Sequence, residues 1–151
     1  MSSNCFLPEL DRKKTQELLE AEFEKYRIFK ATTFEEKEAN ITSSYQELFH
    51  GPTNVTSDQT ANIAIYNIDV PAARKAHIQR IDRAVARLHP KEQLLIRERY
   101  LKDDYVFDYV IYNHIFNPPI SDKTYAKIRW KAFYKLALAL NIAVEKSNNF
   151  L

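Results

Sequence analysis

Glycine is almost absent from this chain, which has one glycine and six prolines among 151 residues. Tight hairpin turns need residues with positive φ, so this scarcity argues against a sheet-rich fold. Because Gly51 is the single glycine, the sequence contains no glycine-rich phosphate-binding loop. The single cysteine, Cys5, excludes an intramolecular disulfide and a zinc site built from several cysteines. We therefore expect neither a nucleotide cofactor nor a structural zinc.

Long apolar runs and catalytic motifs are lacking as well. No segment approaches the ~18–20 consecutive apolar residues of a membrane-spanning helix, and the start of the chain has no basic-then-apolar signal pattern. The four histidines are scattered without metal-ligand spacing, and no serine has a recognisable partner base. We expect a soluble cytoplasmic protein that is not an enzyme and binds no metal, cofactor or membrane.

Charge is present and unevenly distributed. Residues 1–70 contain seven Lys or Arg and twelve Asp or Glu, a net charge of −5. Residues 71–151 contain fifteen Lys or Arg and eight Asp or Glu, a net charge of +7. A basic half joined to an acidic half favours an anionic partner for the basic end, and nucleic acid is the partner we expect.

The N-terminal part predicts one amphipathic helix followed by a connector. Asp11 is a plausible N-cap of a helix over residues 10–30. Apolar residues recur there at steps of three and four: Leu18, Leu19, Phe23, Tyr26 and Phe29. Polar residues dominate residues 31–60, so we expect a loose connector with a short helix over 43–50. Residues 1–56 are thus expected to form an acidic helical segment and connector.

The C-terminal part predicts an all-α domain over residues 57–151. Helical periodicity returns after residue 58, and Pro71 either kinks that helix or begins a new one. The Pro-containing stretch 117–119 predicts a turn. The expected helices cover residues 72–88, 91–101, 103–116 and 121–146. Two helices, a short turn and a helix beginning at Ser121 form the order of a helix-turn-helix.

The last expected helix has two different faces at 100° per residue. The apolar face is Tyr125, Ile128, Ala132, Leu136, Ala139 and Ala143, and the opposite face is Lys123, Lys127, Trp130, Lys131 and Tyr134. A cationic stripe without carboxylates can neutralise phosphates, although a solvated face of a structural helix has the same composition. The two aromatic residues either flank DNA or pack on the N-terminal half or a second subunit.

Several short motifs also carry a resemblance to known proteins. Residues 120–133 (ISDKTYAKIRWKAF) and 88–101 (LHPKEQLLIRERYL) are similar to the helix-turn-helix of sigma-factor region 4. Over nearly the whole chain the order of motifs resembles the ArpU family of phage late-gene transcriptional regulators. The matching segments are residues 7–15 (LPELDRKKT), 25–30 (KYRIFK) and 41–45 (ITSSY), followed by the sigma-like segment.

This resemblance implies a DNA-binding activator of phage or prophage late genes in a bacterial host. Double-stranded promoter DNA is the implied partner, host RNA polymerase is a further one, and a homodimer is left open. Lys123 and Lys127 are expected at base edges, and Arg129 and Lys131 at phosphates or intramolecular acids. The full expected DNA-binding set is Ser121, Lys123, Thr124, Lys127, Arg129, Trp130, Lys131 and Tyr134.

The turn before the last helix departs from the family pattern, which usually contains glycine. Here residues 115–121 (IFNPPIS) are longer, and Asn117 is the expected residue of positive φ. A different class of function stays open beside DNA binding. In that alternative the chain is a helical adaptor that binds another protein through Leu18, Phe23, Tyr26 and Phe29.

Overall fold

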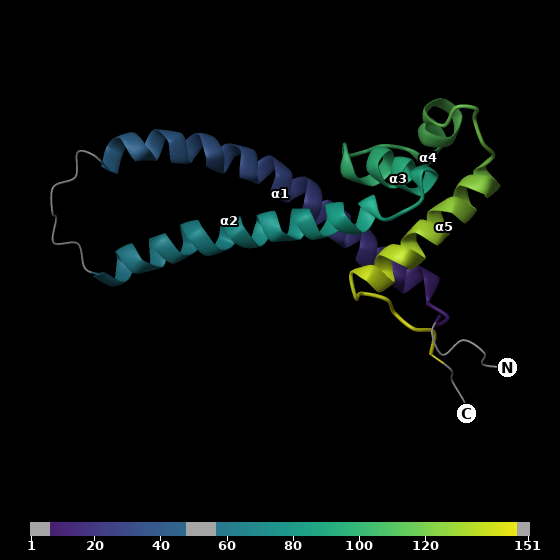
Figure 1. The fold of residues 1–151 in the computed structure, drawn as a ribbon, viewed down its shortest axis with the longest axis horizontal. Coiled ribbons are helices and arrows are strands. Elements are labelled where there is room, and N and C mark those ends of the chain that lie inside the picture. The colour runs from purple at the N-terminus through teal and green to yellow at the C-terminus, as the bar shows by residue number, and fades with distance from the viewer. Residues whose placement is uncertain (1–6, 48–56, 148–151) are drawn as a thin grey trace. The chain divides into compact units, whose positions relative to one another are not determined.

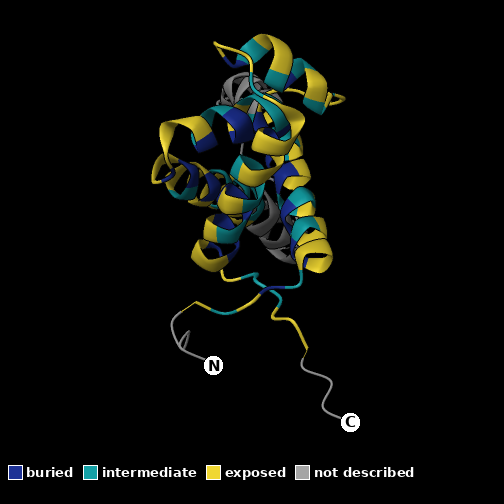
Figure 2. Ribbon diagram, turned by 90° about the vertical axis from the view of Figure 1, so that its right-hand side faces the viewer, coloured by how far each residue is buried: buried dark blue, intermediate teal, exposed yellow. Residues whose placement is uncertain are grey.

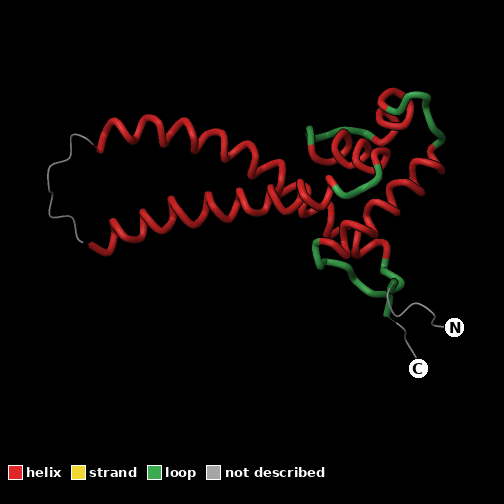
Figure 3. Tube along the Cα trace, viewed as in Figure 1, coloured by secondary structure: helices red, strands yellow, loops and turns green. Residues whose placement is uncertain are grey.

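The computed structural model describes the backbone of residues 7–47 and 57–147, and this part of the chain is all-α, as the sequence predicts (Figures 1 and 3). Its only β-type pairing is an isolated antiparallel bridge between Leu10 and Glu145. In chain order the elements are α1 (Arg12–Glu47), α2 (Ser57–Ala86), α3 (Pro90–Ile96), the π-helical turn η1 (Arg97–Leu101), α4 (Asp108–Val110), the π-helical turn η2 (Ile111–Ile115) and α5 (Asp122–Ala139).

Helix α1 begins where the sequence predicts and continues much further. The Asp11 carboxylate accepts a 3.1 Å hydrogen bond from the backbone N–H of Lys14, which confirms the N-cap. The expected connector over 31–60 and short helix over 43–50 are wrong as far as Glu47, because α1 is continuous to that residue. The hydroxyls of Thr32 and Thr33 donate to carbonyls one turn back, at 2.7 Å each, so these polar residues are accommodated within the helix. Residues 48–56 lie outside the described part.

Helix α2 begins at Ser57, slightly before the expected return of helical periodicity after residue 58, and contains Pro71 in its interior. Of the two alternatives for this proline, the start of a new helix is therefore wrong, and one helix continues through Pro71. The helix ends at Ala86, two residues before the expected end, and His89 and Pro90 begin the next helix.

Of the two middle helices, the first has the predicted extent and the second is shorter than predicted. The expected helix over 91–101 is α3 followed by η1, and the expected helix over 103–116 begins only at Asp108. The turn at 117–119 is confirmed, but Asn117 is not its positive-φ residue. Within the described residues, positive φ occurs at Tyr105 and Asn141.

Helix α5 ends at Ala139, so the expected extension to residue 146 is wrong. Leu140 is its C-cap, and Asn141 takes a φ of 58°, a left-handed conformation that ends helices. The chain then returns to its beginning, where the Asp11 N–H donates to the Val144 carbonyl at 2.8 Å. Because the residues near 144 pair with the residues near 10, the described residues after Asn141 do not continue the helix.

Contacts divide the described residues into two compact units, which we describe separately. One unit comprises residues 7–27 and 81–147, and the other comprises 28–47 and 57–80. In the second unit, the rings of Phe29 and His77 meet edge-on at 5.2 Å between centroids. The expected boundary at residue 56 does not coincide with this division.

The first unit is built around an aromatic cluster from three distant segments. Ring centroids of Phe23 and Tyr100 are 5.2 Å apart, those of Tyr100 and Phe133 are 5.4 Å apart, and those of Phe23 and Phe133 are 6.1 Å apart. All three side chains are buried, and Figure 2 shows the buried positions of the helices in dark blue. The beginning of α1 is therefore part of the same core as the C-terminal helices.

Candidate nucleic-acid interface

The candidate interface is the exposed side of α5, and its first turn is capped by its own side chains. The Ser121 hydroxyl accepts a 3.1 Å hydrogen bond from the backbone N–H of Thr124 and donates to the Thr124 hydroxyl at 2.9 Å. This confirms Ser121 as the N-cap. Both side chains are exposed at the helix N-terminus, where backbone N–H groups and the helix dipole favour an anion.

The buried side of α5 overlaps only in part with the predicted apolar face. Tyr125, Ala132 and Leu136 are buried as predicted, whereas Ala139 is exposed and Ala143 lies beyond the helix. Phe133 and Ala137 are buried although they were not assigned to the apolar face. The buried side is rotated toward Phe133 because that ring completes the aromatic cluster with α1.

Three lysines of α5 share its exposed side. Lys123, Lys127 and Lys131 follow one another at steps of four residues, and all three are exposed. None of them forms an ion pair with any residue that the structure describes. We call these residues the lysine face, and their uncompensated charge makes it a surface that attracts anions.

Trp130 and Tyr134 lie beside the lysine face and contact the N-terminal segment. The Tyr134 hydroxyl donates to the Pro8 carbonyl oxygen at 2.5 Å. The Arg12 guanidinium lies 4.7 Å from the centroid of the Trp130 ring, within cation–π range. Of the alternatives that the sequence leaves open, packing on the N-terminal half is therefore observed.

A groove of about 600 Å³ separates part of this N-terminal segment from α5. Leu7, Trp130, Tyr134 and Leu138 provide its apolar lining, and Leu7 and Leu138 are 57% and 39% exposed. The charged side chains that line it are all cationic: Arg12, Lys127, Lys131 and Lys135. The surface around the lysine face thus combines positive charge with exposed apolar area.

Arg129 makes an intramolecular ion pair, which was one of its two expected roles. Its Nη1 atom lies 3.1 Å from Asp108 Oδ2, and Arg99 Nε lies 2.8 Å from the other carboxylate oxygen of the same residue. Tyr125 donates its hydroxyl to that carboxylate at 2.7 Å. Burial, followed by this hydrogen bond, raises the pKa of Tyr125. Asp108 thereby connects α4, η1 and α5.

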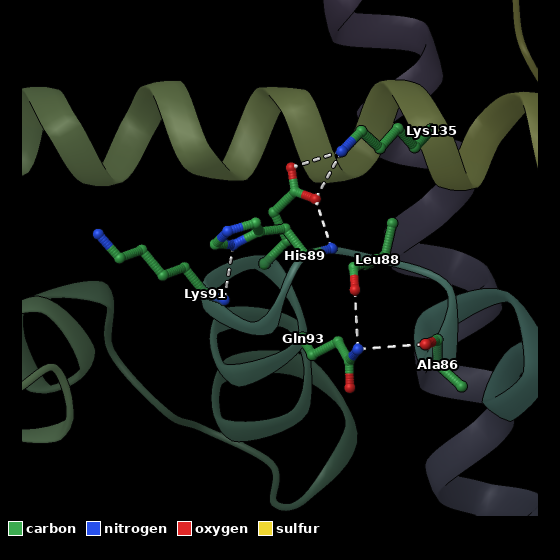
Figure 4. A network of polar contacts seen from close by, with 7 residues as sticks. Ala86, Leu88, His89, Lys91, Gln93 and Lys135 are labelled. Carbon is green, nitrogen blue, oxygen red and sulfur yellow. Dashed lines mark hydrogen bonds and ion pairs between the residues drawn. The ribbon is translucent and has the colours of Figure 1, made fainter.

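Lys135 is a structural residue of α5 that the sequence interpretation missed. Its Nζ atom lies 2.8 Å from Glu92 Oε1, and Figure 4 shows it reaching from α5 toward the beginning of α3. Glu92, only 4% exposed, also accepts a 3.0 Å hydrogen bond from the His89 N–H. His89 in turn accepts at Nδ1 from the Lys91 N–H, which completes a capping box. This network fixes α3 against α5.

Most of the residues that the adaptor alternative needs on the surface are buried or half-buried in this structure. Phe23 and Tyr26 are buried, and the Tyr26 hydroxyl donates to Asp82 at 2.6 Å. Leu18 is exposed, contrary to its assignment to the apolar set of the helix, and Phe29 is half-buried. The four residues therefore do not form one exposed binding face.

Comparison with known proteins gives one distant relative. The chain is 25% identical over 140 residues to an uncharacterized phage-related protein of Listeria innocua serovar 6a. The alignment covers 93% of this chain and 96% of the relative, so the likeness spans both units. No family model matches the chain, and no solved structure matches it. Among the described helices, none has both the length and the apolarity needed to cross a membrane.

Proposed function

We propose that this chain is a phage protein that binds duplex DNA through the lysine face of α5. One observation carries the proposal: Lys123, Lys127 and Lys131 project from one side of one helix without ion pairs to described residues. A helix with such a side fits the major groove and neutralises phosphates there. The name of the Listeria relative supports the phage origin, and the likeness covers nearly the whole of both chains.

The support of α5 favours a role as a recognition helix. Its buried side is held by the aromatic cluster, and its polar flank is held by Arg129–Asp108 and Lys135–Glu92. Such anchoring keeps the three lysines in fixed relative positions, which lowers the entropic cost of docking on a rigid duplex. In this proposal Lys123 and Lys127 contact base edges, Lys131 contacts phosphate, and Arg129 orients the helix from within the protein.

The binding experiment measures anisotropy of labelled duplex fragments from the late-gene region of the phage that encodes the chain. We expect Lys127→Ala/Lys131→Ala to weaken binding by ~2–4 kcal/mol, because it removes one base contact and one phosphate contact. The matched control is Lys25→Ala/Lys102→Ala, which removes two exposed lysines that pair with Glu22 and Glu98. An equal loss of DNA affinity in both double variants would show that only total charge matters, and it would exclude α5 as the helix that recognises DNA.

We further propose that DNA binding activates transcription of phage late genes, without any enzymatic step by this chain. The sigma-like order of α3, η1, α4, η2 and α5 supports this, since region 4 of sigma factors both reads promoter DNA and contacts polymerase. In vitro transcription from the late promoter tests it, with core polymerase in the presence and absence of the housekeeping sigma factor. Activation is expected only when that sigma factor is present. Transcription by core enzyme and this chain alone would identify a complete sigma factor instead.

A further inference from the structure

A second groove, of about 420 Å³, lies between α1 and the segment formed by η1 and the residues that follow it. We call it the acidic groove, and the residues that define it are Glu17, Glu20, Glu24, Tyr100, Asp103 and Tyr105. Glutamates at steps of three and four residues share one side of a helix, so α1 presents three carboxylates to the same groove. None of its lining residues belongs to α5.

The negative charge of the acidic groove is only partly compensated. Glu17, Glu24 and Asp103 form no ion pair with any described residue. The two arginines that also line the groove are committed to other acids. Arg27 pairs with Asp104 and donates to a backbone carbonyl, and Arg99 pairs with Asp108. The groove therefore keeps a surplus of carboxylates that an incoming cation can neutralise.

Tyr100 adds an unsatisfied polar atom to this site. This residue is 3% exposed and lines the groove, and its hydroxyl has no hydrogen-bond partner among the residues that the structure describes. A buried hydroxyl without a partner costs ~1–3 kcal/mol, so such groups are uncommon unless a ligand or water satisfies them. Burial raises the pKa of Tyr100 to about 12, with Arg129 and Arg99 acting against the rise and Asp108 and Glu20 adding to it. At neutral pH the phenol thus stays protonated, and its oxygen is able to accept a hydrogen bond from an N–H donor.

Tyr105 is the third observation at the acidic groove. Its φ is 61°, which lies in the left-handed region. Among residues other than glycine, this region is adopted most often by residues such as asparagine and aspartate, and it is uncommon for a large residue such as tyrosine. Its side chain is 96% exposed, so burial of the ring does not compensate for this conformation. Backbone strain of this kind gathers at ligand sites, and an exposed tyrosine ring provides a face for cation–π contact.

We propose that the acidic groove binds an arginine-rich segment of a partner protein. A guanidinium matches each feature of the groove: it pairs with carboxylates in a bidentate manner, donates to a phenol oxygen and stacks on an aromatic ring. Charge complementarity excludes DNA as the occupant, because its phosphates would meet the carboxylates of α1. The site is independent of the proposed DNA binding, since it uses none of the residues of the lysine face.

The test uses the full chain and a fluorescein-labelled hexa-arginine peptide, with anisotropy as the measurement. We expect Glu17→Gln/Glu24→Gln to weaken peptide binding by about fivefold, since two exposed ion pairs are lost. Glu9→Gln/Glu145→Gln changes the net charge equally at exposed sites outside the groove and is expected to bind as the unmodified chain does. Tyr100→Phe is expected to weaken binding by about threefold while leaving thermal stability unchanged or higher.

Three results would overturn the proposal. Equal weakening in both glutamate double variants would mean that only net charge attracts the peptide. Displacement of the peptide by magnesium chloride at constant ionic strength, with no effect of Tyr100→Phe, would identify a divalent-cation site. Self-association in sedimentation equilibrium that only the groove variant loses would identify a second copy as the occupant. Binding of duplex DNA by Glu17→Gln/Glu24→Gln, measured in parallel, separates failure at this groove from failure at the lysine face.

Discussion

The Tyr134 hydroxyl donates a 2.5 Å hydrogen bond to the carbonyl oxygen of Pro8, which lies 126 positions earlier in the chain. This bond and the Arg12–Trp130 contact hold the N-terminal segment along α5. The two aromatic residues of the candidate interface are thus engaged within the protein. The lysine face is the part of α5 whose charge is left for an external partner.

Asp108 is expected to be more important for stability than any other acid near it. Asp108→Ala removes the partner of Arg99, Arg129 and the Tyr125 hydroxyl in one step. We predict a loss of ~2–3 kcal/mol in the free energy of unfolding, measured by urea denaturation with circular dichroism. Asp103→Ala is the control, because Asp103 is exposed and forms no ion pair with described residues. Equal losses in the two variants would refute the structural role of Asp108.

Lys131 and Lys135, one turn apart on α5, are expected to behave in opposite ways. Lys135→Ala leaves the buried carboxylate of Glu92 without its ammonium partner, so we predict a loss of ~1–3 kcal/mol in stability. Lys131→Ala removes an exposed side chain and should change stability by less than ~0.5 kcal/mol while weakening DNA binding. A stability loss at Lys131 as large as that at Lys135 would contradict these assignments.

The raised pKa of Tyr100 predicts a loss of stability at high pH. Its value of about 12 in the folded chain lies above the ordinary 10.0, so folding favours the neutral phenol. This stabilisation is complete below pH 10 and is lost as the pH rises toward 12, by at most about 1.4 kcal/mol per pH unit.

Urea denaturation between pH 8 and pH 11.5, with unmodified chain and Tyr100→Phe in parallel, tests this at about the pH values where the phenol titrates. The variant should equal or exceed the unmodified chain at pH ~8, since the lost hydroxyl has no partner in the described part of the chain, and its advantage should grow above pH ~10. A constant difference across the whole range would show that Tyr100 titrates normally.

A fragment of residues 57–151 is expected to be unfolded, although its sequence predicts a separate domain. It lacks Phe23, which packs on Tyr100 and Phe133, and it lacks Tyr26, the partner of Asp82. Removal of a fully buried aromatic ring costs ~3–5 kcal/mol, comparable to the total stability of a small domain. A cooperative thermal transition of the fragment, followed by circular dichroism, would contradict this expectation.

The sequence was informative about local features of the fold. The short polar side chains of Asp11 and Ser121 precede apolar periodicity and predict two N-caps, and both predictions are confirmed. The breaks at Pro90 and at residues 117–119 followed from proline chemistry. The all-α class followed from helical periodicity and from the scarcity of glycine.

The sequence was less informative about features that depend on distant contacts. The end of α5 is set by pairing of residues near 144 with residues near 10, which no local pattern reveals. The role of Lys135 depends on Glu92, a residue of another helix. The capping box of His89 and Glu92, and the lysine that reaches it, are identified by the fold alone.

The salt dependence of DNA affinity tests the central claim most directly. The logarithm of the association constant should fall linearly with the logarithm of salt concentration, with a slope of about −0.9 for each phosphate neutralised. For Lys127→Ala/Lys131→Ala the slope should be shallower by about 0.9, because one phosphate contact is lost, whereas Lys25→Ala/Lys102→Ala should keep the slope of the unmodified chain. An affinity that does not change with salt, or the same slope in all three proteins, would contradict DNA binding through the lysine face.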